Sequence, residues 1–218
     1  MSGIYADTHR RLQDRFETRR LADRLEEIIV REDIDEQAAA FIASRNMVFL
    51  STITPDGMPT VSYKGGAPGF VRIVDATTLA LPSYDGNGMY YSMGNLAERP
   101  EVGLLFIDFE TPHRLRVHGR ATIDPADPLL AEMPGAELVA RIAITKLWIN
   151  CPRYIHRFER KATSRNVPAA DCTAPLAEWK RIDVVQDVLP DRDVARVGEA
   201  GGIVTIEDYG ARVARGEG

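Results

Sequence analysis

The chain has 218 residues, of which 44% are hydrophobic and 27% charged, and its formal net charge is −5. This composition is typical of a globular protein with one sizeable core, and the acidic balance argues against a nucleic-acid partner. No apolar run of about 18 residues predicts a membrane span, the first ten residues lack the apolar core of a secretory signal, and Cys151 and Cys172 make no disulfide framework, so we expect a cytoplasmic protein with reduced thiols.

The first part of the chain is predicted to be helical. Apolar residues recur at helical spacing from Asp7 to Val30, with charged residues between them. A second helix is expected from Asp35, which can cap it, to Ser44. We therefore expect a helical arm over residues 1–34.

The pattern then changes to short runs of β-forming residues. Residues 47–64 read as a hairpin whose turn contains Pro55 and Gly57. Further strands are predicted at residues 70–74, 78–81, 102–109, 115–123 and 139–149, although the alanines of the last segment leave a helix open. Many short strands with few helices indicate a mainly β chain of the α+β class, a small antiparallel barrel over residues 35–160.

The remainder of the chain shows weaker patterns. A short helix is expected at 152–158, and from residue 161 onward the sequence is rich in Ala, Pro, Asp and Gly. We expect helical segments around 176–188 and 206–213. We interpret residues 161–218 as an extension that packs on the barrel or is partly flexible, and not as a second domain.

The most informative segment is the polar loop that follows the strand ending near Leu81. A helix is predicted to begin near Met89, and the unpaired N–H groups and positive dipole end of a helix start bind phosphate readily. The candidate contacts in this segment are Ser83, Asp85, Gly86, Asn87, Gly88, Met89, Ser92 and Asn95. The alternative is an ordinary turn followed by a helix capped by Asp85 or Asn87. The glycine spacing is neither a Rossmann fingerprint nor a P-loop.

Cationic side chains elsewhere in the chain are further candidates. Lys64 ends a predicted strand before two glycines, where its ammonium can meet a phosphate, although a solvent-facing strand end is the ordinary alternative. Arg114, Arg116 and His118 alternate along one strand and share a face. That face can line an anion-binding groove, or it can meet water or pair with carboxylates such as Asp108.

The histidines and Cys151 suggest no separate chemistry. No histidine pair has metal-binding helical spacing, so we expect no metal site. Cys151 lacks a signature for an activating base, which favours a structural thiol over a nucleophile.

Seven short motifs occur in a fixed order along the chain. They are Leu50-Ser-Thr-Ile-Thr-Pro-Asp-Gly-Met-Pro59, Lys64-Gly-Gly-Ala-Pro-Gly-Phe70, Asp85-Gly-Asn87, Ser92-x-Gly-Asn-Leu96, Gly103-Leu-Leu-Phe-Ile-Asp108, Arg114-x-Arg-Val-x-Gly119 and Asn150-Cys-Pro-Arg-Tyr154. In this order they resemble the pyridoxamine 5′-phosphate oxidase-related FMN-binding proteins, over about Asp35 to Arg157.

The resemblance implies a six-stranded split barrel that forms a homodimer, with one FMN in each of two clefts between subunits. It places the phosphate against Lys64 and against the strand-loop-helix segment that contains Ser83, Asn87, Met89 and Ser92. It also implies that Arg114 meets the edge of the flavin ring and that Arg153 and Tyr154 come from the neighbouring subunit.

Two departures bear on the activity. The true oxidases carry Arg and Lys in the phosphate loop, where this chain has Asn87-Gly-Met89, and they end in a basic, Trp-containing segment that this chain lacks. The resemblance therefore favours another FMN-dependent oxidoreductase, one that transfers hydride or electrons between a small molecule or NAD(P)H and an acceptor. The alternative is a non-catalytic protein that binds or stores flavin, deazaflavin or haem, with His113, His118 or His156 as a haem ligand.

Overall fold

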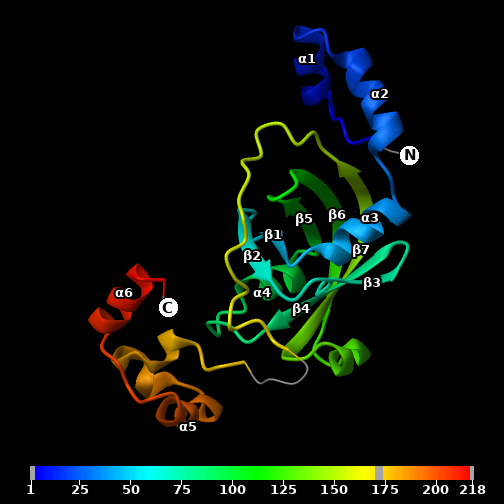
Figure 1. Cartoon of the computed structure of the whole chain (residues 1–218). Helices are drawn as coiled ribbons and strands as arrows, with labels where there is room; N and C mark the ends of the chain where they lie inside the picture. The colour runs from blue at the N-terminus through cyan, green and yellow to red at the C-terminus, as the bar shows by residue number, and fades with distance from the viewer. Residues whose placement is uncertain (1–2, 170–173, 217–218) are drawn as a thin grey trace. The chain divides into compact units, whose positions relative to one another are not determined.

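The computed structural model describes residues 3–169 and 174–216, so Cys172 lies outside the described residues (Figure 1). The chain divides into two compact units, one up to Lys161 and one from Ala162. Within the described part, no helix is long and apolar enough to cross a membrane.

Three helices precede the sheet. They are α1 (Asp7–Arg15), α2 (Arg19–Ile29) and α3 (Glu36–Ser44). The single long helix expected at the N-terminus is therefore wrong: Glu17 has a positive φ of 56°, a left-handed conformation that ends α1 and turns the chain into α2. The cap of α3 is as predicted, because the Ala38 N–H donates to the Asp35 carboxylate at 2.8 Å.

The sheet is entirely antiparallel. Its strands are β1 (Met47–Ile53), β2 (Pro59–Gly65), β3 (Arg72–Asp75), β4 (Thr78–Tyr84), β5 (Glu101–Asp108), β6 (His113–Asp124) and β7 (Ala136–Ile149). The spatial order is β2-β1-β5-β6-β7-β4-β3. This confirms the expected fold class, a split β-barrel with helical additions.

The expected count of six strands is wrong. The sheet has seven strands and is open, with β2 and β3 at its two edges. β3 is only four residues long and pairs with β4 alone, with a register shift between Ile73 and Asp75. It is therefore a short edge strand added to the sheet.

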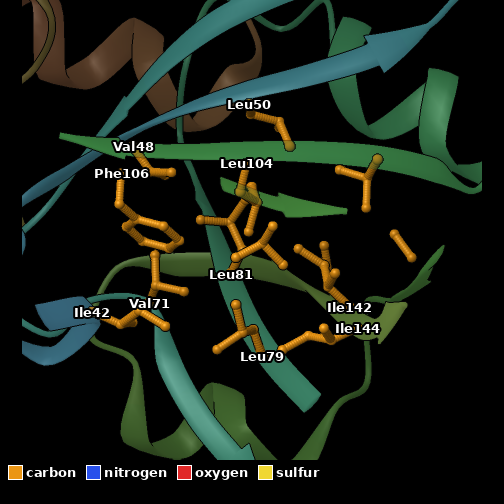
Figure 2. Close-up of a cluster of buried hydrophobic side chains, with 14 of the residues drawn as sticks. Ile42, Val48, Leu50, Val71, Leu79, Leu81, Leu104, Phe106, Ile142 and Ile144 are labelled. Atoms are coloured by element: carbon orange, nitrogen blue, oxygen red, sulfur yellow. The ribbon is translucent and has the colours of Figure 1, made fainter. Parts of the chain in front are cut away.

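The core lies on the concave inner face of the sheet. Figure 2 shows the side chains that meet there, from α3, from Val71 just before β3 and from alternate positions along the other strands: Ile42, Val48, Leu50, Val71, Leu79, Leu81, Leu104, Phe106, Ile142 and Ile144. This alternation is what period-two side-chain geometry requires of a sheet with one buried face. The ambiguous alanine-rich segment is the long strand β7 because its alternate residues fill this core.

Two short helices complete the barrel unit. They are the 3-10 helix η1 (Pro128–Glu132) and α4 (Tyr91–Glu98). The helix expected at 152–158 is absent, because Tyr154 has a left-handed φ of 72° and the segment forms only a turn.

The second unit, from Ala162, is built from short helices. They are η2 (Glu178–Arg181), η3 (Asp183–Val188), α5 (Asp191–Glu199) and α6 (Ile206–Ala214), of which α5 was not expected from the sequence. Lys180 and Asp193 form an ion pair of 2.8 Å in which both side chains are buried. The unit thus contains its own buried contacts; its packing on the barrel stays a prediction.

Candidate functional site

A row of hydroxyl and amide groups joins α4 to the inner face of β1 and β2. The Asn95 side-chain amide donates to Thr52 Oγ1 at 3.1 Å, and Thr52 is in turn 2.9 Å from Thr60 Oγ1. One turn earlier on α4, Ser92 Oγ is 2.9 Å from Ser62 Oγ. Ser92 and Asn95 therefore share one helix face, as their spacing predicts.

These contacts fix the direction in which α4 crosses β2. Asn95 is linked to Thr60 through Thr52, whereas Ser92, one turn earlier on the helix, contacts Ser62. Lys64 is the next residue on the same strand face, about 6.6 Å beyond Ser62 at roughly 3.3 Å per residue. Lys64 is therefore the strand position that lies toward the N-terminal end of α4.

Lys64 is a half-buried cation without a counter-ion. None of the described residues forms an ion pair or hydrogen bond with its ammonium. Burial lowers its pKa below the usual 10.5, because desolvation disfavours the charged form. An anionic ligand here would supply the missing charge partner.

The start of α4 is also open. The helix begins at Tyr91, two residues later than predicted, after Tyr90 in a left-handed conformation with φ 48°. The N-cap residue Tyr90 makes no side-chain capping hydrogen bond. The first-turn N–H groups of a helix lack intrahelical partners and stand at its positive dipole end, which is the arrangement that binds anions.

The loop before α4 does not provide the expected cap. Asn87 Oδ1 accepts from the Met89 N–H at 3.1 Å, which closes a turn in the loop ahead of the helix. Gly88 has a positive φ of 74°, whereas Gly86 does not occupy the left-handed region. Ser83 is half-buried at the end of β4, and the loop from Asp85 to Tyr91 is exposed.

Arg114 lies on the other side of the sheet. Leu115 and Val117 are buried in the core, so Arg114, Arg116 and His118 project from the outer face, as predicted. Arg114 and Lys64 therefore occupy opposite faces of one chain's sheet. The structure brings Lys64, Ser62, Ser92 and the α4 terminus together, but not Arg114.

Two polar atoms near Arg114 are buried without a partner. They are Arg114 Nε and Asn150 Oδ1, and the two residues are neighbours because the Asn150 N–H donates to the Arg114 carbonyl at 3.3 Å. A buried donor or acceptor left unpaired is costly, so such atoms mark a place where another molecule can bond. Asp108, one proposed partner for the cationic face, instead pairs with Arg45 at 2.7 Å.

Arg153 lies just beyond β7 in an exposed segment. Its guanidinium is 5.9 Å from the centre of the Tyr154 ring, and Tyr154 is 88% exposed. The preceding Cys151 is an exposed free thiol whose Sγ accepts from the Arg153 N–H at 3.4 Å. Among the described residues, no hydrogen bond or ion pair joins Arg153 to Lys64, Ser62 or Ser92.

The outer face of the sheet contains a cavity of about 630 Å³. Its walls include apolar side chains of three strands, among them Phe49, Val61 and Leu105, together with Arg116 and His118. His118 packs edge-on against Trp148, with 4.8 Å between ring centres. Burial, followed by the nearby Arg116 charge, lowers the pKa of His118.

The sequence reasoning missed two contributors to these sites. Ser62 alternates with Lys64 along one strand and holds Ser92, and strand periodicity would have found it. Asn150 begins one of the quoted motifs, but its place beside Arg114 depends on the β6–β7 register, which the motif does not show. Within the described ranges, no group of three or more His, Cys, Asp or Glu side chains is arranged to hold a metal ion.

Comparison with known proteins adds a family match. Residues 34–170 match the family model described as pyridoxamine 5′-phosphate oxidase. A search of curated proteins gave no match. The matched region contains the whole sheet, α4 and every candidate residue from Lys64 to Arg153.

Several solved structures are similar to the chain. An FMN-binding protein from Syntrophomonas wolfei is 12% identical, with TM-score 0.44, covering 64% of this chain and 97% of its own. HutZ, the heme storage protein from Vibrio cholerae, is 16% identical, with TM-score 0.40 and coverage of 53% and 94%. HupZ from Group A Streptococcus is 16% identical, with TM-score 0.44 and coverage of 53% and 93%.

Proposed function

This chain belongs to the pyridoxamine 5′-phosphate oxidase family, and on that premise we propose that it binds FMN and acts as an FMN-dependent oxidoreductase. The observation that carries the proposal is the half-buried Lys64 ammonium, which has no counter-ion among the described residues and lies toward the uncapped start of α4. A cation and a helix N-terminus directed at one place form a phosphate site.

The residues present fit the phosphate end of FMN. Lys64 would supply the charge, the first-turn N–H groups of α4 would donate hydrogen bonds, and the Ser62–Ser92 pair would fix the helix against β2. The exposed loop from Asp85 to Met89 leads into this helix start. The loop has no cationic side chain, its one charged residue being Asp85, which leaves Lys64 as the main source of positive charge on this face.

The orphaned Arg114 Nε and Asn150 Oδ1 suit the polar edge of a flavin ring, which carries both hydrogen-bond acceptors and donors. A bound flavin would supply hydride and electron transfer between a small molecule or NAD(P)H and an acceptor. The part of Arg114 would be to hold a permanent positive charge where negative charge accumulates on reduction.

We further propose a homodimer with the cofactor sites between subunits. The outer face exposes large apolar residues on the edge strand β2, with Val61 68% and Tyr63 62% exposed, and these adjoin the cavity beside Phe49. A contiguous apolar surface of this kind favours a protein partner. A second copy would cover it and would also bring its own Arg114 toward the first copy.

The decisive test is to identify what the purified protein binds. The expected result is a yellow protein with flavin absorbance that releases FMN in a mass spectrum, with one FMN per subunit of a dimer. NADH or NADPH should bleach the absorbance under anaerobic conditions, and air should restore it. A haem Soret band, a released deazaflavin or a protein that stays colourless with added FMN would each contradict the proposal.

A further inference from the structure

The α1–α2 hairpin is closed by polar contacts. Arg10 pairs with Asp23 at 2.5 Å and also lies 4.7 Å from the centre of the Tyr5 ring, while Arg19 pairs with Asp14 at 2.5 Å. Neither helix contains a buried residue. The two helices are therefore joined by charged groups, whereas paired helices ordinarily meet through their apolar sides.

The apolar side of the hairpin is exposed. Its five large side chains follow helical spacing along the two helices, and their exposed fractions are Leu12 57%, Phe16 67%, Leu21 59%, Leu25 39% and Ile28 59%. An amphipathic helix of this kind is stabilised mainly by burying such a stripe. The stripe therefore requires a cover that the contacts of the hairpin do not provide.

The charges around the stripe favour a second hairpin as that cover. From Asp7 to Arg20 five arginines outnumber three acidic residues, whereas from Leu21 to Ile29 three acidic residues outnumber one arginine. The hairpin is thus neutral as a whole but positive in one part and negative in the other. Two copies related by a two-fold axis can place unlike parts together, whereas an anionic membrane surface favours a net basic helix.

The base of the hairpin pairs with the edge of β7, beyond the part of that strand that pairs with β4, and makes one ion pair on the outer face of the sheet. Arg31 and Leu147 exchange backbone hydrogen bonds of 2.9 and 2.8 Å, and Glu32 pairs with Lys146 at 2.7 Å. Lys146 lies opposite His118 in the β6–β7 register, on the same face as the cavity. The hairpin therefore begins at the face that we propose is covered by a second copy.

We infer that the hairpins of two copies pack through their apolar stripes, so that residues 7–29 act as a dimerisation arm. This inference rests on the proposed dimer but adds a contact outside the cofactor site. The stripe residues are the energetic centre of that contact, and the flanking charges favour the two-fold arrangement that places the basic part of one hairpin beside the acidic part of the other.

The test compares two variants of the full chain by sedimentation equilibrium. Leu21→Gln combined with Leu25→Gln removes apolar surface but keeps good helix formers, and it should raise the dimer dissociation constant at least tenfold. Arg24→Lys, which keeps the charge at an exposed position of α2 that is not one of the five stripe residues, is the matched control and should change it less than threefold. Far-ultraviolet circular dichroism checks that both variants keep their helices.

The outcomes separate the arm from the cofactor site. An unchanged dissociation constant in the double variant, with wild type still a flavin-bound dimer, would overturn the arm and leave the proposed function standing. A wild-type monomer would overturn both. Flotation of wild type, but not of the double variant, on vesicles of phosphatidylserine and phosphatidylcholine would show a membrane as the cover and would also overturn the arm.

Discussion

The replacement Lys64→Ala tests the proposed phosphate site most directly. In the structure the ammonium is half-buried and has no protein counter-ion, so its loss breaks no ion pair within the described chain. If the ammonium donates a charge-assisted hydrogen bond to phosphate, its removal should cost about 1–3 kcal/mol, or roughly 5- to 150-fold in Kd. Because the site is partly screened from water, we expect the loss to persist at moderate salt.

The assay is a fluorescence titration with FMN and with riboflavin, which lacks the phosphate. Lys64→Ala should weaken FMN binding and leave riboflavin binding nearly unchanged, whereas Lys161→Ala, at an exposed position outside the sheet, should affect neither. FMN affinity of the wild type should also fall as the pH rises through the lowered pKa of Lys64, below 10.5, because the neutral amine no longer attracts phosphate. That alkaline decrease should be missing in Lys64→Ala. Equal losses for both ligands would refute this reasoning.

Three further predictions concern stability. Burial lowers the pKa of His118, so below pH 6.5 the unfolded chain binds a proton more readily than the folded chain, and the free energy of unfolding should decrease as the pH falls. His118→Gln should flatten this pH dependence in denaturant titrations at several pH values. An unchanged dependence would exclude His118 as its cause. Gly119→Ala would place a Cβ 2.6 Å from the Ala143 carbonyl oxygen and should lower the free energy of unfolding by about 1–3 kcal/mol, with a wild-type melting temperature as the contrary result. Asp193→Asn removes the charge from the buried pair with Lys180 and should destabilise the second unit by about 3–5 kcal/mol, seen as faster proteolysis of residues 162–218; wild-type resistance would contradict this.

Strand positions were predictable from the sequence because a sheet with one buried face alternates its side chains. Arg114 and His118 could thus be assigned to one face before any coordinates were known. The start of α4 was less predictable, because Tyr90 adopts a left-handed conformation that is uncommon outside glycine and asparagine, and because Asn87 bonds within the loop instead of capping the helix. Short sequence patterns do not predict the start of a helix where the backbone conformation depends on residues distant in the sequence.

The contacts within the candidate site were also only partly predictable from the sequence. Motif order identified Lys64 and the loop before α4, but only the strand pairing shows that Ser62 holds Ser92 and that Asn150 adjoins Arg114. Both contacts join residues more than 29 positions apart in the chain. The sequence-based interpretation also treated the candidates as one site, because alternation along separate strands does not say which faces of those strands coincide.

Lys64 and Arg114 lie on opposite faces of one sheet, so if both contact one flavin they must come from different subunits. A mixture of Lys64→Ala and Arg114→Ala chains tests this by complementation. In a mixed dimer with shared sites, one site carries both replacements and the other carries neither, so a fraction of sites should regain wild-type FMN affinity. If each site were formed within one chain, every site would keep one defect and mixing would restore nothing. Titration of the two variants before and after subunit exchange measures that fraction, and its absence would show that the site is not shared.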